Sequence, residues 1–167
     1  MLIERIGNAR ANSVWEALCD SQRSGSSIFS GPSPPAKPLP TSTREEREAF
    51  IVAKYVQKVF VQKMQPSAAA ALLYRSAAIG DLVDMVRAIA AGADINWRNQ
   101  EDFMRSPLHV SCEGRHVLCV ELLCLANASV DEKDAQGKTP LDYSVGADGA
   151  AILDILINKL ERDLQMH

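Results

Sequence analysis

Four residues with metal-binding or nucleophilic side chains follow one another at helical spacing in this chain. They are His109, Cys112, His116 and Cys119, separated by three, four and three positions. On one continuous helix these positions share a face, and imidazole nitrogens and thiolates so arranged can bind zinc. A Cys–His pair could also form a nucleophile and its base, but no third group that would orient the base is apparent. The zinc hypothesis therefore depends on whether a single helix carries all four residues.

The surrounding sequence contains two near copies of one tetrapeptide, 33 positions apart. Ser106-Pro107-Leu108-His109 recurs as Thr139-Pro140-Leu141-Asp142. In each copy the hydroxyl residue can cap a helix, and proline suits the first helical position because its φ is already fixed and no amide is missed. A period of 33 residues with such a start resembles the ankyrin repeat. That repeat implies a turn near residues 114–116, which separates the first His–Cys pair from the second. We therefore predict no metal site and no catalytic residue.

A third, more degenerate unit lies upstream. Residues 73–77 line up with residues 108–112, and residues 92–96 resemble the G-A-D-V-N end of an ankyrin unit. Gly92 and, one unit later, Asn127 suit a chain that leaves a helix through a left-handed residue. The offset of 35 between these two units predicts an enlarged loop at residues 99–105. We expect repeats at about 70–99, 100–134 and 135–164, within a repeat region of residues 67–167.

The resemblance implies an all-α fold, an ankyrin-repeat solenoid of about three helix pairs. Such stacks hold another protein on their loop tips, called fingers, and on their inner helices. Trp and Arg are frequent in protein interfaces. Our binding candidates are Trp97, Arg98, Phe103 and Arg105 on the first finger and Asp131, Glu132, Lys133 and Asp134 on the second. Two alternatives stay open: Trp97 packs across its own finger or onto the N-terminal helix, and the second finger is only a solvated charged loop.

Charge is distributed unevenly along the chain. Residues 1–66 carry a net charge of +3 and residues 67–167 a net charge of −6. The basic segment could contact an anionic membrane at its periphery. Nucleic-acid binding is not expected, because the pI is about 5.6 and no basic cluster with aromatic residues occurs. The chain shows neither a secretory signal nor an apolar run of about 18 residues, and these features favour a cytoplasmic location.

The N-terminal third predicts two helical segments and a linker. Residues 1–18 form the first segment, and residues 20–43 are rich in Ser and Pro. Thr43 and Glu46 have the spacing of a capping box at the start of the second segment, an apolar helix over residues 45–62 that Pro66 ends or bends. Its apolar stripe, which needs a covering surface, comprises Ile51, Val52, Tyr55, Val56, Val59 and Phe60.

Two motifs in this third resemble the C-terminal part of Arf GTPase-activating domains. Residues 6–16 match the pattern I-G-N-x-x-A-N-x-x-W-E, and residues 44–60 resemble R-E-x-x-x-x-I-x-A-K-Y-x-x-x-x-F, with one more residue between Glu45 and Ile51 than the pattern has. The motif residues singled out are Gly7, Asn8, Asn12, Trp15, Lys54 and Tyr55. In members of this family with several domains, ankyrin repeats follow the Arf-activating domain directly. Residues 1–66 thus resemble a partial Arf-activating domain that precedes the ankyrin solenoid.

The chain departs from the family pattern at the catalytic half. Arf-activating domains begin with a four-cysteine zinc finger, C-x2-C-x16-C-x2-C, followed by a catalytic arginine, and this chain contains no C-x2-C pair. The resemblance therefore implies zinc only in an upstream half, and an Arf-type GTPase as the partner of the full-length protein in vesicle traffic at endosomal or Golgi membranes. We predict a fragment that is inactive by itself and acts through ankyrin-mediated protein binding. The alternative is a stand-alone, non-catalytic ankyrin scaffold.

Overall fold

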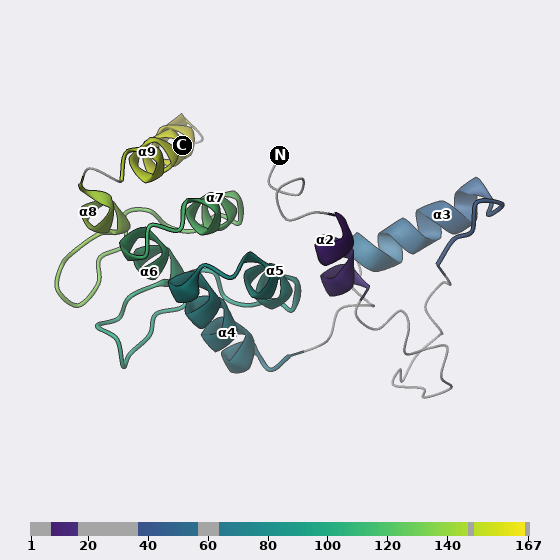
Figure 1. Ribbon diagram of the computed structural model, residues 1–167, viewed down its shortest axis with the longest axis horizontal. Coiled ribbons are helices and arrows are strands. Elements are labelled where there is room, and N and C mark those ends of the chain that lie inside the picture. The colour runs from purple at the N-terminus through teal and green to yellow at the C-terminus, as the bar shows by residue number, and fades with distance from the viewer. Residues whose placement is uncertain (1–7, 17–36, 57–63, 147–148, 166–167) are drawn as a thin grey trace.

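The computed structural model describes residues 8–16, 37–56, 64–146 and 149–165. These residues are helical apart from loops and one isolated antiparallel β-bridge between Asn99 and Arg105, which confirms the predicted all-α class (Figure 1). The helices are α2 (Asn8–Trp15), α3 (Arg44–Ile51), α4 (Pro66–Ile79), α5 (Leu82–Ala90), α6 (Pro107–Glu113), α7 (Val117–Leu125), α8 (Pro140–Ser144) and α9 (Ala150–Gln165), with a π-helix, η2 (Val52–Val56), after α3.

Three helix pairs, α4/α5, α6/α7 and α8/α9, stack side by side. The first helix of each pair begins at a proline, namely Pro66, Pro107 and Pro140, as expected where the missing N–H costs no hydrogen bond. Pro66 therefore starts α4, whereas the sequence predicted only that it ends or bends the preceding element. In repeat two, α6 ends at Glu113 and α7 begins at Val117, so the predicted turn between them is confirmed.

Left-handed residues end the outer helices where the sequence predicted them. Gly92 and Asn127 have φ values of 90° and 66°, and their amides bond back to Ile89 and Cys124. In the loop after Gly92, Phe103 and Met104 both have positive φ values beside the bridge between Asn99 and Arg105. The predicted enlargement at residues 99–105 is therefore present as a bridged loop.

One hydrophobic core runs through all three helix pairs. Leu73 and Met85 from the first pair, Leu108 and Leu123 from the second, and Leu156 from the third are each at most 1% exposed. Cys112, Cys119 and Cys124 are buried in the same core, where burial raises the pKa values of their thiols to about 12, 11 and 11. These thiols stay protonated at neutral pH, which suits core residues rather than nucleophiles.

The N-terminal helix packs on the first repeat. Val14 and Trp15 of α2 contact a patch formed by Val83, Val86 and Ala90 of α5. Before α3, the predicted capping box is confirmed, because the amide of Thr43 donates to Glu46 Oε2 at 2.9 Å and the amide of Glu46 donates to Thr43 Oγ1 at 3.3 Å. Most of the predicted linker, and the end of the predicted helix beyond residue 56, lie outside the described residues.

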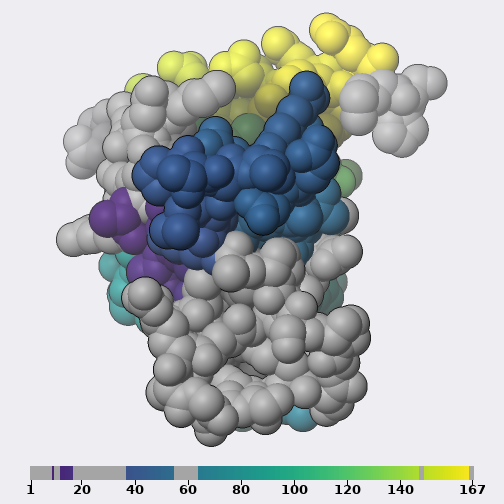
Figure 2. Space-filling model, turned by 90° about the vertical axis from the view of Figure 1, so that its right-hand side faces the viewer, coloured from purple at the N-terminus to yellow at the C-terminus, as the bar shows by residue number. Residues whose placement is uncertain are grey.

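The structure describes the side chains of only two residues of the predicted apolar stripe, since those of Tyr55, Val56, Val59 and Phe60 lie outside the described residues. Ile51 and Val52 are exposed, whereas Phe50 and Ala53 are buried. The predicted continuous α-helix changes to a π-helix at Val52, where each turn takes up more residues and the buried side shifts relative to an α-helical pattern. Figure 2 shows α3, in blue, at the molecular surface. No helix in the described parts of the chain is both long and apolar enough to span a bilayer.

Candidate functional site

The two fingers are versions of one hairpin that differ by two residues. In the second finger (residues 129–138) the amide of Asp134 donates to the carbonyl of Lys138 at 2.9 Å. In the first finger (residues 94–105) Asn99 makes the same bond, also 2.9 Å, to Arg105. The side-chain oxygens of Asp134 and Asn99 each accept an amide two residues further on. Asn99 in the first finger thus takes the place of Asp134 in the second. The first finger is longer because it has two more residues between this position and the end of the hairpin.

Backbone and side-chain hydrogen bonds tie the fingers to each other. The amide of Ala135 donates to the carbonyl of Phe103 at 2.7 Å, and the amide of Ser129 donates to Asn96 Oδ1 at 2.9 Å. Arg98 bridges the two, because its Nε donates to the carbonyl of Met104 at 3.1 Å and its Nη2 donates to the carbonyl of Lys133. The finger surface is therefore held in place before any partner binds.

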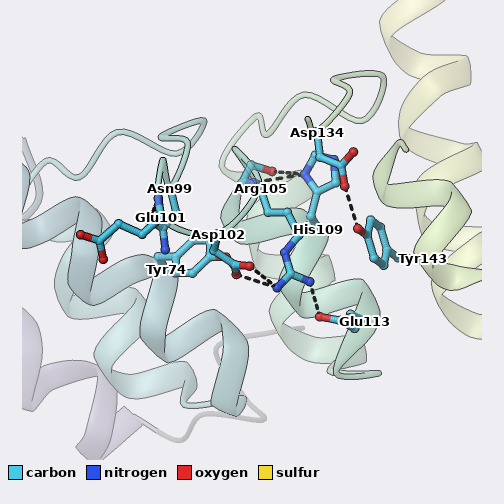
Figure 3. Close-up of polar contacts among 10 residues, drawn as sticks. Tyr74, Asn99, Glu101, Asp102, Arg105, His109, Glu113, Asp134 and Tyr143 are labelled. Atoms are coloured by element: carbon cyan, nitrogen blue, oxygen red, sulfur yellow. Dashed lines mark hydrogen bonds and ion pairs between the residues drawn. The ribbon is translucent and has the colours of Figure 1, made fainter. Parts of the chain in front are cut away.

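A cluster of polar side chains links the first finger to the inner helices (Figure 3). Asp102 accepts from the hydroxyl of Tyr74 on α4 and forms a two-pronged ion pair with Arg105 Nη2, at 2.5 and 2.6 Å. Arg105 Nη1 also pairs with Glu113 on α6 at 2.6 Å. Burial favours the neutral acid, but the bonds from Tyr74 and Arg105 outweigh it and lower the pKa of Asp102. Burial and the Asp102 carboxylate raise the pKa of Tyr74.

His109 joins the second repeat to the second finger. Its ring is fully buried; Nδ1 accepts from the amide of Ser106 at 3.2 Å, and Nε2 lies 3.2 Å from the carbonyl of Lys138. These contacts assign a neutral ring that carries its proton on Nε2. Tyr143 packs edge-on against the ring and donates to Asp134 Oδ2 at 2.7 Å. His109 therefore has a structural role, because it ties α6 to the second finger.

The buried imidazole predicts a loss of stability in mild acid. Burial lowers the pKa of His109 below its ordinary value of 6.5, so the unfolded chain binds the proton more readily than the folded chain. The stabilising contribution is complete above pH 6.5 and decreases as the pH falls towards the lowered pKa. Urea unfolding at pH 7.5 and 5.5 should show this loss, and His109→Gln should lose less between the two pH values than the parent. Equal losses would contradict the assignment.

The remaining residues of the zinc hypothesis are not gathered into one site. His116 precedes α7 and its Nε2 contacts the carbonyl of Ala78 in the first repeat at 3.1 Å. A Cβ on Gly80 would lie 2.7 Å from the His116 ring, so that glycine permits the close contact between repeats. Among the described residues no group of three or more potential metal ligands occurs.

The binding candidates on the two fingers differ in how far the protein itself occupies them. Arg98 and Arg105 are bonded within the protein, and Trp97 packs edge-on against Tyr74 with ring centroids 5.8 Å apart. Phe103, Asp131 and Lys133 are exposed, Phe103 to 57%. Of the other second-finger candidates, Glu132 is partly exposed and Asp134 is buried.

Sequence reasoning missed Tyr74, Asp102, Glu113 and Tyr143, which position the finger. The two inserted residues of the first finger could have pointed to Asp102 but not to the other three.

Two residues of the N-terminal motifs contact each other across 42 positions. Lys54 Nζ donates to Asn12 Oδ1 at 2.8 Å and pairs with Glu16 Oε1 at 2.6 Å. Burial favours protonation of Glu16, but the bonds from Lys37 and Lys54 prevail and lower its pKa. Trp15 is partly buried on α5. Gly7 lies outside the described residues, as do the side chains of Asn8 and Tyr55.

Comparison with a family model agrees with this architecture. The family model for ankyrin repeats (3 copies) matches residues 73–166. Human ARF GTPase-activating protein GIT2 is 32% identical over 155 residues, covering 86% of this chain and 19% of the relative. The rat Arf-GAP with coiled-coil, ANK repeat and PH domain-containing protein 2 is 29% identical over 105 residues, covering 63% of this chain and 12% of the relative. The crystal structure of the human ASB11 ankyrin repeat domain has a TM-score of 0.48 and 31% identity, covering 52% of this chain and 38% of that one.

The match to one relative covers both the ankyrin repeats and part of the N-terminal third. The match to human GIT2 extends beyond residues 73–166 and so includes part of the N-terminal third. The chain spans about one fifth of that relative's length. The resemblance found in the sequence is therefore confirmed: this chain belongs to the ankyrin-repeat family and is related to Arf GTPase-activating proteins that carry ankyrin repeats.

Proposed function

We propose that this chain is the ankyrin-containing part of a regulator of Arf small GTPases, and that it works by binding another protein. The observation that carries the proposal is the match to an ARF GTPase-activating protein over 86% of the chain. The contact of Lys54 with Asn12 supports it, because these two residues belong to separate motifs of the resemblance.

The finger surface supports a binding role. Phe103 is exposed, and its backbone is fixed by the bond from Ala135 and by the bridge between Asn99 and Arg105. An aromatic side chain on a fixed backbone can anchor a partner at a small cost in conformational entropy. Asp131 and Lys133 on the second finger are exposed and would form part of a polar rim around that anchor.

The purified chain should not accelerate GTP hydrolysis by an Arf GTPase. The family resemblance implies that the zinc finger and the catalytic arginine lie in a half that these residues do not match. Single-turnover hydrolysis of GTP bound to an Arf GTPase should proceed at its intrinsic rate when the chain is added, while a full-length ankyrin-containing activator serves as the positive control. A clear increase in rate with the chain alone would refute this part of the proposal.

The alternative is a stand-alone, non-catalytic ankyrin scaffold, which would bind its partner through the same fingers without belonging to an activator of GTP hydrolysis. The proposal also includes a cytoplasmic location with peripheral contact to endosomal or Golgi membranes, for which the +3 charge of residues 1–66 is the supporting observation.

A further inference from the structure

The last helix exposes an apolar stripe. Leu153, Ile157, Leu160 and Leu164 follow one another in α9 at spacings of four, three and four, so they lie along one side of the helix. Ile157 is 45% exposed and Leu164 is 78% exposed, whereas Leu153 is partly buried and Leu160 packs partly against the core. Ile152 and Leu156 on the adjoining side are fully buried in the core. Apolar side chains in such a row are positioned to contact a second helix.

Because the repeats recur every 33 residues, each residue of the stripe can be compared with its counterpart in α7. Leu153 and Ile157 are the counterparts of Val120 and Cys124 in α7. Those two residues are 0% and 5% exposed, and α9 is the helix that packs against α7 in the next repeat. The same positions in α9 thus form a surface for contact between repeats, and no element of the described part of the chain buries Ile157 there. Figure 1 shows α9 at the end of the stack.

The length of α9 argues against another finger-bearing repeat at this surface. In repeat two the chain leaves its outer helix after Leu125, through the left-handed Asn127. The counterpart of Asn127 is Leu160, which lies inside α9, and the helix continues to Gln165. The continuation carries the stripe on to Leu164. A helix lying along α9 fits this extended surface better than a repeat that requires a finger at Leu160.

The charges beside the stripe indicate what the partner helix should carry. Asp154 and Glu161 are exposed and seven positions apart, so they form an acidic row next to Ile157. The guanidinium of Arg162 is turned back to the carbonyl of Asn158 on the far side of that row. The repeat region as a whole has a net charge of −6. We propose that α9 binds a basic amphipathic helix of a partner protein, which covers Ile157 and Leu164 and places Lys or Arg beside Asp154 and Glu161.

A pair of designed peptides tests this proposal. One is a helical peptide of about 18 residues with Leu at the a and d heptad positions and Lys elsewhere; the other has Glu in place of Lys. Fluorescence anisotropy at low salt should show the Leu–Lys peptide binding the full chain at least about tenfold more tightly than the Leu–Glu peptide. The double variant Ile157→Ser, Leu164→Ser should weaken binding of the Leu–Lys peptide about tenfold. Asp154→Asn with Glu161→Gln should weaken it about threefold and flatten its dependence on salt.

Control variants distinguish the loss of a contact on α9 from the loss of an exposed apolar residue elsewhere. Ile79→Ser replaces an apolar residue of the first repeat that is 73% exposed, close to the 78% of Leu164, and should leave peptide affinity unchanged. Circular dichroism checks that each variant is folded. Equal binding of the two peptides, or unchanged affinity in the Ile157 and Leu164 variant, would overturn the proposal. Sedimentation that reveals a dimer of the parent chain, abolished by the same double variant, would assign the stripe to a second copy and would overturn it as well.

Discussion

Replacing Leu123 by alanine is expected to lower the free energy of unfolding by about 2–5 kcal/mol. Leu123 is fully buried in α7, and α7 packs against α5 on one side and α9 on the other. Truncating its side chain removes apolar contacts and leaves a cavity in the shared core, which the stacked helices can only partly fill by relaxing. Because the repeats share one core, both neighbours of the second repeat should lose stability. Urea unfolding followed by circular dichroism measures the change.

Leu125→Ala provides the matched control. Leu125 lies two residues further along α7, is 60% exposed, and undergoes the same chemical change in the same helix. Its replacement should alter the free energy of unfolding by less than about 0.5 kcal/mol. Similar losses for the two variants would mean that the buried face of α7 is assigned wrongly, and with it the register of the repeats.

Much of the repeat region could be predicted because its determinants are local. Pro107 and Pro140 begin helices, Asn127 ends one, and the turn before His116 follows from the period of 33 residues. Each depends on backbone preferences within a few positions, which the sequence displays directly. The two inserted residues of the first finger were also visible as a change in the period. Local preferences of this kind do not reveal which distant side chains will meet.

The candidate site was predicted less well for that reason. Arg98 and Arg105 were named because arginine is common in interfaces, yet both guanidinium groups bind partners inside the protein. Asp102 meets Tyr74 from 28 positions away. The type of a side chain does not show whether the fold supplies it with a partner. The π-helix at residues 52–56 was missed for a similar reason, since its apolar residues also fit an ordinary amphipathic α-helix.

The contact between Lys54 and Glu16 leads to the second large expected effect, in the N-terminal helices. The side chains of Lys54 and Glu16 are only 6% and 12% exposed. Lys54→Met keeps an unbranched side chain but removes the cation, so the Glu16 carboxylate would remain largely buried with the more exposed Lys37 as its cationic partner. Breaking one side of a buried ion pair typically costs about 3–5 kcal/mol, and the remaining contact to Lys37 should reduce this cost to about 2–3 kcal/mol.

Hydrogen exchange can locate this loss, because Lys54 joins η2, which continues directly from α3, to α2, while α2 is held on the first repeat by Val14 and Trp15. In the Lys54→Met variant the amides of α3 should exchange much faster, those of α2 somewhat faster, and those of α6 and α7 at the parent rate. Arg44→Met is the matched control, since it removes an exposed ion pair to Glu48 from α3 and should change exchange little. Equal effects of the two variants would show that the Lys54 contact does not hold α3 to α2. Faster exchange in α3 alone would show that Val14 and Trp15 suffice to keep α2 on the repeats.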